Sequence, residues 1–551
     1  MNNVKSLSII LLISLGLVSP SLAVIKSDCN TDCDTSSCSD SCDTTGDCND
    51  SCDENCNSSH GRTSTFFRPR DITGDLTYRN NMHFYNKYHD ARCNFFTWDT
   101  SFIYSQSRKG RRLGSGFLCA NPLKVTEQEG GDFAALNLQL SRLDTSATPP
   151  VPSYASTFSL CPYRKTISLL NQLYFNLDCF WTGLWGTIDF AVVNAKHKLN
   201  INETVLNGPS DLGNVANGDG SPASNAALAA LPTNVTEAFA GLNTFATDCS
   251  HTGIDDLYFR IGYDYSYCSN DHLGIYLVGI APTGKSFDNT RWFQPLVGSK
   301  HGAIGVGLTG DYTLWCCEQD ASDLVFQTEL KYQYRLRHHE ARTFDYNCGP
   351  CSRFNLIVER SESTTTPETN NIIAVPGIDH LRACVRIEPR HELQWWANFH
   401  YQWCNWGAEL SYNLWWRDRE NICDSNNFDF GNFGIFSFCC PDATAPLTSQ
   451  TGECRLVSAQ PAGTAANDAT NPCVQDSTFT NIVAKDVNLC SGAAQRVLTH
   501  KVAGAISYNS VWCDCYPFLV GFGAGYEFAS KKDARHALEN WHVQGRFDVS
   551  F

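Results

Sequence analysis

Seven cysteines lie close together near the amino terminus, in a tract rich in Asp, Ser, Thr and Asn: Cys29, Cys33, Cys38, Cys42, Cys48, Cys52 and Cys56. Thiols form disulfides, and thiolates and carboxylates can bind metal ions. The spacing differs from the C-x2-C pattern of zinc sites. Because seven is odd, full oxidation requires at least one partner outside the tract. The tract therefore predicts cross-links to other molecules or a locally cross-linked linker, with a metal site as an alternative that we do not favour.

Other cysteines recur at short turns between predicted strands and at the start of the first strand: Cys93, Cys179, Cys268, Cys316, Cys317, Cys404, Cys513 and Cys515. Cysteines on adjacent turns can pair if their Cα atoms lie about 5–6 Å apart. A third group falls in long connections, where a disulfide constrains the unfolded chain most: Cys348, Cys351, Cys423, Cys439, Cys440, Cys454, Cys473 and Cys490. In total, 27 cysteines indicate an exported chain in an oxidising compartment.

Charged residues of both signs alternate with apolar residues along the predicted strands. The candidates for lining a lumen are Arg260, Asp264, Glu329, Lys331, Arg335, Arg337, Arg382, Arg386, Glu409 and Glu527. Arg335, Arg337, Arg382 and Arg386 form the clearest basic cluster on neighbouring predicted strands. Charges inside a pore tune its selectivity. Mutual ion pairs that fill a narrow lumen are the alternative interpretation.

The element that positions Arg382 and Arg386 is the run from 381 to 403. Its odd positions are mostly apolar and its even positions mostly polar, as expected of one strand with two different faces. At about 3.3 Å per residue it would reach roughly 75 Å, whereas strands of soluble sheets usually have 3–10 residues. A long strand with one apolar face is typical of a transmembrane barrel. We expect Leu330, Leu336, Ile387 and Leu410 to face lipid.

Similar alternation recurs along residues 93–551 and predicts an all-β chain with one closed antiparallel barrel. We count twelve strands, with ten to sixteen possible. Short joins near 179–183, 268–271, 316–322, 404–406 and 513–517 alternate with longer ones, as in outer-membrane barrels. A soluble protein with several Greek-key domains is the alternative. Pro389 is the point at which the long run is most easily divided, because Pro cannot donate to a ladder.

Residues 1–92 divide into segments of different composition. Residues 1–23 resemble a secretory signal, with Lys5, an apolar stretch and a small-x-small cleavage site. Residues 24–65 form the acidic cysteine-rich segment, which we expect to be disordered and periplasmic. In residues 66–92, Leu76, Met82 and Tyr85 suggest a short helix lying in or under the lumen. The net charge of −16 argues against a nucleic-acid partner.

The last residues, 541–551, alternate between apolar and polar and end on Phe551. This segment resembles the closing strand of Gram-negative outer-membrane β-barrel proteins. The cysteine content and layout resemble the major outer-membrane proteins of intracellular bacteria, although no motif matches them residue by residue. The resemblance implies a bacterial outer-membrane location with both termini periplasmic and lipid as a partner.

Two functions follow from this reading. The first is a porin-like channel for passive diffusion of small hydrophilic solutes. The second is a structural or surface protein of the envelope, a plugged barrel that displays disulfide-stapled loops and is cross-linked to other envelope proteins or to further copies of itself. We expect no enzymatic activity and no cofactor, because the sequence contains no G-x-S-x-G, H-E-x-x-H or P-loop motif.

Overall fold

The computed structural model describes residues 65–82, 95–108, 110–118, 121–126, 133–134, 154–207, 233–240, 242, 248–266, 271–284, 292–317, 321–346, 352–354, 356–361, 371–423, 433–437, 478–481, 487–513, 516–530 and 533–551. The signal peptide, the cysteine-rich tract and Tyr85 lie outside these residues, as do Cys93, Cys268 and Cys515.

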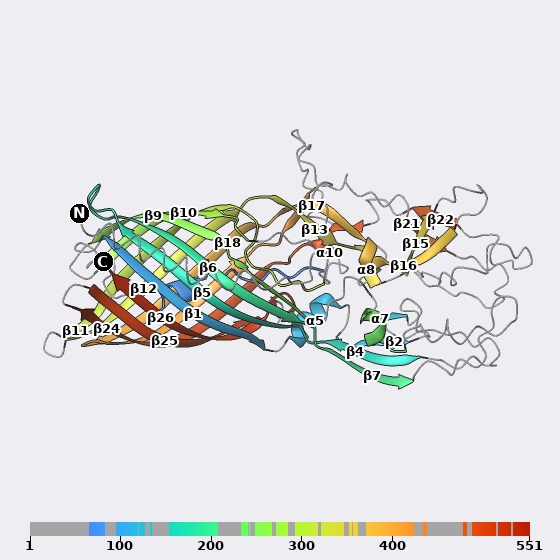
Figure 1. Cartoon of the computed structure of the whole chain (residues 1–551), viewed down its shortest axis with the longest axis horizontal. Coiled ribbons are helices and arrows are strands. Elements are labelled where there is room, and N and C mark those ends of the chain that lie inside the picture. Colours follow the sequence, from blue (N-terminus) through green and yellow to red (C-terminus); the bar gives the residue numbers. More distant parts are fainter. Residues whose placement is uncertain are drawn as a thin grey trace, which may run out of the picture. The chain divides into compact units, whose positions relative to one another are not determined.

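Twelve antiparallel strands form a closed barrel, which confirms the predicted fold class (Figure 1). In chain order they are β1 (Phe96–Arg108), β5 (Tyr163–Asn176), β6 (Leu184–Lys198), β9 (Leu257–Ser266), β10 (His272–Ala281), β11 (Ala303–Cys317), β12 (Ser322–Arg335), β18 (Arg390–Trp403), β19 (Trp406–Arg417), β24 (Val497–Trp512), β25 (Tyr516–Ala529) and β26 (Glu539–Ser550). The barrel closes because β1 pairs with both β5 and β26: Phe102 lies opposite Leu169 on one side and Gly545 on the other.

Short and long connections alternate around the barrel, as predicted. The short ones span 177–183, 267–271, 318–321, 404–405 and 513–515. They define the short-turn end of the barrel, and the remaining connections define the long-loop end. At the long-loop end the chain forms small additional sheets and helices (Figure 1).

The outer face of the barrel is apolar. Leu273, Ile275 and Leu277 on β10 are more than half exposed, whereas Tyr276 between them is buried. Leu330, Leu336 and Leu410 are likewise exposed, at 38%, 45% and 59%. This alternation puts an apolar belt outside and polar side chains inside, which is the pattern of a barrel surrounded by lipid.

The predicted single strand 381–403 is wrong, because it is two strands in different sheets. β17 (Arg382–Glu388) pairs with β13 (His338–Thr343) and β20 (Asn421–Cys423) at the long-loop end, and only β18 belongs to the barrel. Pro389 lacks an N–H for the ladder, and Arg390 takes a left-handed φ of 65°. The apolar face of β17 packs into a protein core, where Ile387 is fully buried and does not face lipid.

The other elements at the long-loop end form small units. A four-stranded sheet contains β2 (Leu123–Thr126), β3 (Phe133–Ala134), β4 (Ala155–Leu160) and β7 (Ile201–Asn207); a second contains β15 (Leu356–Ser361), β16 (Asn371–Pro376), β21 (Phe433–Ser437) and β22 (Thr478–Asn481). β14 (Asp345–Tyr346) pairs with β23 (Val487–Asn488), and β8 (Asp248–Ile254) pairs with β6. The helices are α5 (Arg111–Phe117), α7 (Val235–Ala240), α8 (Gly377–His380), α10 (Leu489–Gly492), η4 (Ser352–Phe354) and η6 (Asp533–Arg535).

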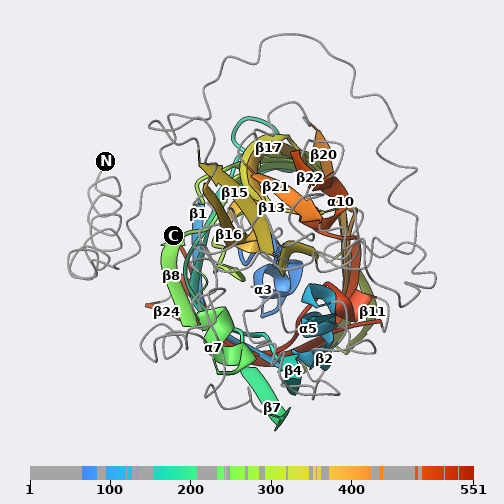
Figure 2. The ribbon, with the colours of Figure 1, turned by 90° about the vertical axis from the view of Figure 1, so that its right-hand side faces the viewer.

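A short helix occupies the inside of the barrel. It is α3 (Leu76–Asn80), and all five of its residues are buried. Viewed along the barrel, α3 lies within the ring of strands (Figure 2). It falls in the segment where the sequence suggested a helix in or under the lumen. Leu76 and Met82 are both fully buried.

Candidate functional site

Residues 65–82, which we call the lumen segment, run from one end of the barrel toward the other. At the long-loop end, the N–H of Thr65 donates to the carbonyl oxygen of Ser491 at 2.7 Å. The hydroxyl of Thr65 donates to the carbonyl oxygen of Thr343 at 2.6 Å. At the far end of the segment, the N–H of Met82 donates to Oε2 of Glu409 at 2.8 Å. Glu409 follows the short turn at 404–405 closely. The segment therefore extends through the lumen.

The fold of α3 depends on its surroundings. Five residues are too few for a stable isolated helix. Asp75 caps its amino end by accepting a hydrogen bond from the N–H of Thr77 at 2.9 Å. Asp75 also forms ion pairs with Lys501 of the wall and with Arg70, the latter at 3.2 Å. Lys501 of the wall and Arg70 of the segment therefore stabilise the cap of the helix.

Glu329 of β12 holds the carboxyl end of α3. Its carboxylate forms a buried ion pair with Arg79 and accepts a hydrogen bond from the side chain of Asn80 at 2.8 Å. On the opposite side of the helix, Arg546 of β26 donates to the carbonyl oxygens of Arg79 and Asn81, each at 2.6 Å. These contacts come from strands on two sides of the barrel, so the helix is fixed across the lumen.

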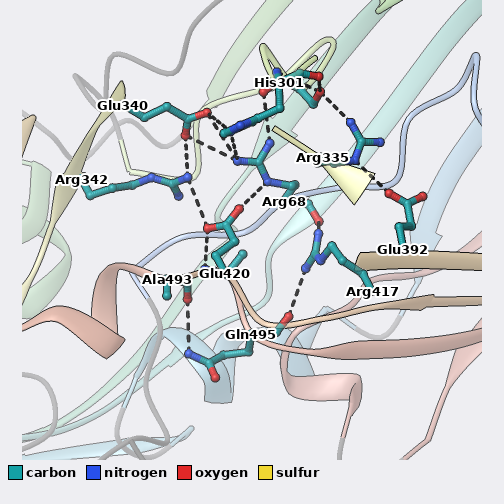
Figure 3. Close-up of polar contacts among 12 residues, drawn as sticks. Arg68, His301, Arg335, Glu340, Arg342, Glu392, Arg417, Glu420, Ala493 and Gln495 are labelled. Atoms are coloured by element: carbon teal, nitrogen blue, oxygen red, sulfur yellow. Dashed lines mark hydrogen bonds and ion pairs between the residues drawn. The ribbon is translucent and has the colours of Figure 1, made fainter. Parts of the chain in front are cut away.

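A second buried network binds the start of the segment at the long-loop end (Figure 3). Nε of Arg68 lies 2.6 Å from Glu420, and its Nη2 lies 3.4 Å from Glu340. Arg342 forms ion pairs with the same two carboxylates. Burial alone would raise the pKa of Glu420, but Arg68 and Arg342 lower it to about 2. Glu420 is therefore ionised at any physiological pH.

The backbone of the segment is held as well. Lys331 donates to the carbonyl oxygen of Gly74 at 2.6 Å, and Gln394 donates to the same oxygen at 3.0 Å. Arg417 donates to the carbonyl oxygen of Arg68 at 2.9 Å. Between segment and wall, a cavity lined by Arg70, Tyr78 and other side chains holds only about 30 Å³.

Six of the ten predicted lumen residues are buried barrel residues with polar partners inside: Arg260, Glu329, Lys331, Arg335, Glu409 and Glu527. Asp264, on β9, is half-buried. Arg337 is exposed just beyond the end of β12. Arg382 and Arg386 lie on β17, outside the barrel sheet, because the chain is divided at Pro389. The four arginines therefore do not form a basic cluster in the lumen.

Sequence reasoning missed the charged side chains of the lumen segment that form ion pairs with the barrel wall and with the long-loop end. They are Arg68, Arg70, Asp71, Asp75 and Arg79 in the lumen segment. The available signal was a short run with charges of both signs, Arg68 to Asp75, in the segment that precedes the first strand. A polar run before a barrel is also compatible with an exposed linker, so the signal alone does not identify a lumen segment.

The cysteines at short turns are only partly described. Cys179, Cys316 and Cys513 are exposed free thiols. Pairing across adjacent turns therefore stays a prediction, as does cross-linking through the cysteine-rich tract. No group of described residues brings three cysteine sulfurs together as metal ligands.

Comparison with known proteins leaves the family of this chain open. No family model matches the sequence, and no curated protein matches it. Among solved structures, an outer-membrane channel from Pseudomonas putida F1 is similar over 84% of this chain and 98% of its own, with 9% identity and a TM-score of 0.35. The transport unit of the autotransporter AIDA-I from Escherichia coli is similar over 88% of this chain and 99% of its own, with 7% identity and a TM-score of 0.27. The toluene transporter TodX from Pseudomonas putida is similar over 89% of this chain and 96% of its own, with 9% identity and a TM-score of 0.26.

Scores this low carry no argument about function, and the barrel assignment rests on the strand pairing itself. Within the described part of the chain, none of the helices has the length and apolar character needed to cross a membrane.

Proposed function

We propose that this protein is an outer-membrane channel for small hydrophilic solutes. In the structure, its own lumen segment closes the channel. The observation that carries the proposal is residues 65–82, fixed inside a closed barrel whose wall is polar inside and apolar outside. The polar interior suits water and hydrophilic solutes, and the apolar belt suits lipid. Passage then requires the segment to move.

Displacement of the segment is chemically feasible because its contacts are mostly ionic and polar. Arg70, Asp71, Asp75 and Arg79 pair with wall residues, and Arg68 pairs with Glu420 at the long-loop end. Water can solvate such groups once the segment leaves, which would leave a polar pore behind. An apolar plug would lack this property, because its release would expose apolar surface to water.

Single-channel recording in planar bilayers tests the proposal. We expect the intact protein to be mostly closed with rare openings. A variant lacking residues 66–82, verified as folded by heat-dependent electrophoretic mobility, should give a steady conductance. A point variant, Arg79→Gln, keeps the segment and should raise the frequency of openings. Arg112→Gln provides the matched control, because it also removes an arginine from an ion pair, here with Glu539. The side chain of Arg112 is half-exposed and lies outside the segment.

A structural role in the envelope is the second candidate, favoured by the number of buried ion pairs that fix the segment. It predicts that neither the deletion variant nor Arg79→Gln conducts, although both are folded. That result would refute the channel proposal.

A further inference from the structure

Three carboxylates face one another where the lumen segment meets the wall. Asp71 belongs to the segment, and Asp255 and Asp256 join β8 to β9 at the long-loop end. One ligand oxygen from each residue lies within 4.8 Å of the other two. Asp255 and Asp256 are 2% and 0% exposed. Burial of several acidic groups at one point requires compensation by a positive charge or a proton.

The hydrogen bonds leave one carboxylate oxygen unused. Oδ2 of Asp255 accepts from the N–H of Ile72 at 2.9 Å, and from the N–H and hydroxyl of Thr73 at 2.9 and 3.0 Å. Oδ1 of the same carboxylate is buried and has no hydrogen-bond partner among the described residues. A buried carboxylate oxygen without a donor is costly, and a bound cation would satisfy it.

The other two carboxylates do have partners. Asp71 pairs with Arg335 and accepts from the hydroxyl of Tyr258 at 3.3 Å. Asp256 accepts from the N–H and hydroxyl of Ser299 at 2.9 and 2.5 Å and from the N–H of Gly284 at 3.3 Å.

The positive charge in contact with the cluster is too small to balance it. Arg335 pairs with Asp71 and lies 3.9 Å from Asp256, but it also pairs with Glu392 at 2.9 Å. One guanidinium is thus shared among three carboxylates, and Asp255 has no ion pair of its own within the described residues. Burial, together with the charges of Asp71 and Asp256, raises the pKa of Asp255 to about 7.

We propose that Asp71, Asp255 and Asp256 form a divalent-cation site, suited to Ca²⁺, that links the lumen segment to the barrel wall. Ca²⁺ binds carboxylate oxygens at about 2.3–2.6 Å, so two ligands on opposite sides of the ion lie up to about 5 Å apart. Mg²⁺ binds at about 2.0–2.1 Å and holds opposite ligands near 4 Å. Oxygens that all lie within 4.8 Å of one another can therefore bind one Ca²⁺. The site does not depend on whether the barrel conducts.

Calcium titration of the folded, chelator-treated full chain in detergent tests this site, with binding followed by calorimetry. We expect one saturable site. Asp255→Asn keeps the shape and the acceptor for Ile72 and Thr73 but removes the charge, and should weaken binding by about 10–100-fold or more. The matched control is Asp248→Asn on β8, which removes the same charge from a 43% exposed side chain paired with Lys196 and Lys198. It should bind as the unmodified protein does.

The outcomes are distinguishable even if one variant misfolds. Asp71→Asn is a second charge-removing variant and should also lose the site. Absence of calcium binding by the intact protein would overturn the proposal, as would equal binding by the intact protein and a folded Asp255→Asn variant. If Asp255→Asn is more stable than the intact protein at pH 8 and calcium has no effect on either, the cluster holds a proton instead, which also overturns the proposal.

Discussion

Arg79 of the lumen segment and Glu329 of the barrel wall form an ion pair in which both side chains are almost completely buried. Their positions in the sequence are 250 residues apart. The pair joins the helix inside the barrel to the middle of β12 and illustrates how the lumen is filled.

Removing one member of this pair should destabilise the folded barrel. Glu329→Gln leaves the guanidinium of Arg79 buried without its carboxylate, and losses of this kind cost about 3–5 kcal/mol. We expect a lower denaturant midpoint in detergent. The double variant Arg79→Met, Glu329→Gln should recover part of the loss, because no unpaired charge remains. Additive effects of the two changes would mean that the two side chains do not interact.

The outward-facing position of Leu410 can be tested by charge. Leu410→Arg places a cation on the apolar belt, which costs about 2–4 kcal/mol near the bilayer midplane. We expect poor folding into lipid vesicles, measured by heat-dependent electrophoretic mobility. Leu206→Arg is the control, because Leu206 is 67% exposed on β7, in the small sheet at the long-loop end. Equal folding yields for both variants would contradict the assignment of the lipid-facing side.

The position of Thr65 predicts the side on which the preceding chain emerges. Thr65 contacts Thr343 and Ser491 at the long-loop end. The orientation expected from the sequence puts this end outside the cell. The Cα atoms of Gly61 and Thr65 are separated by four peptide units and can lie no more than about 15 Å apart. A protease site inserted after Gly61 should therefore be cut when protease is added to intact cells. Cleavage only after the outer membrane is permeabilised would instead favour the periplasmic position expected from the sequence.

Calcium should stabilise the protein more at pH 8 than at pH 5. The raised pKa of Asp255, about 7, means that its contribution to stability is full below the unfolded value near 3.9 and is lost as the pH rises through about 7. A cation can replace the lost proton only at the higher pH. The charged groups that act on this carboxyl are Asp71, Asp256 and Arg164. Tyr258 and Arg335 act on its neighbours Asp71 and Asp256.

Thermal unfolding with calcium and with chelator at both pH values measures this effect. A calcium-dependent shift of equal size at pH 5 and pH 8 would contradict it. Asp255→Asn should show no calcium-dependent shift at either pH.

The strand pattern of the barrel could be predicted from the sequence because alternation with a period of two is local. Leu410 and Glu409 are neighbours that face opposite sides, and no distant contact is needed to infer this. The alternation of short and long connections then gave the closed twelve-strand fold.

Two decisions required the tertiary structure. Alternation cannot distinguish lipid from a protein core, so Ile387 had the same pattern as a lipid-facing residue although it is buried under β13 and β20. The partners of the interior charges were also hidden. Asp71 meets Arg335, and Arg79 meets Glu329, across hundreds of residues. Ion pairing depends on distance in space, which only closure of the barrel around the lumen segment determines.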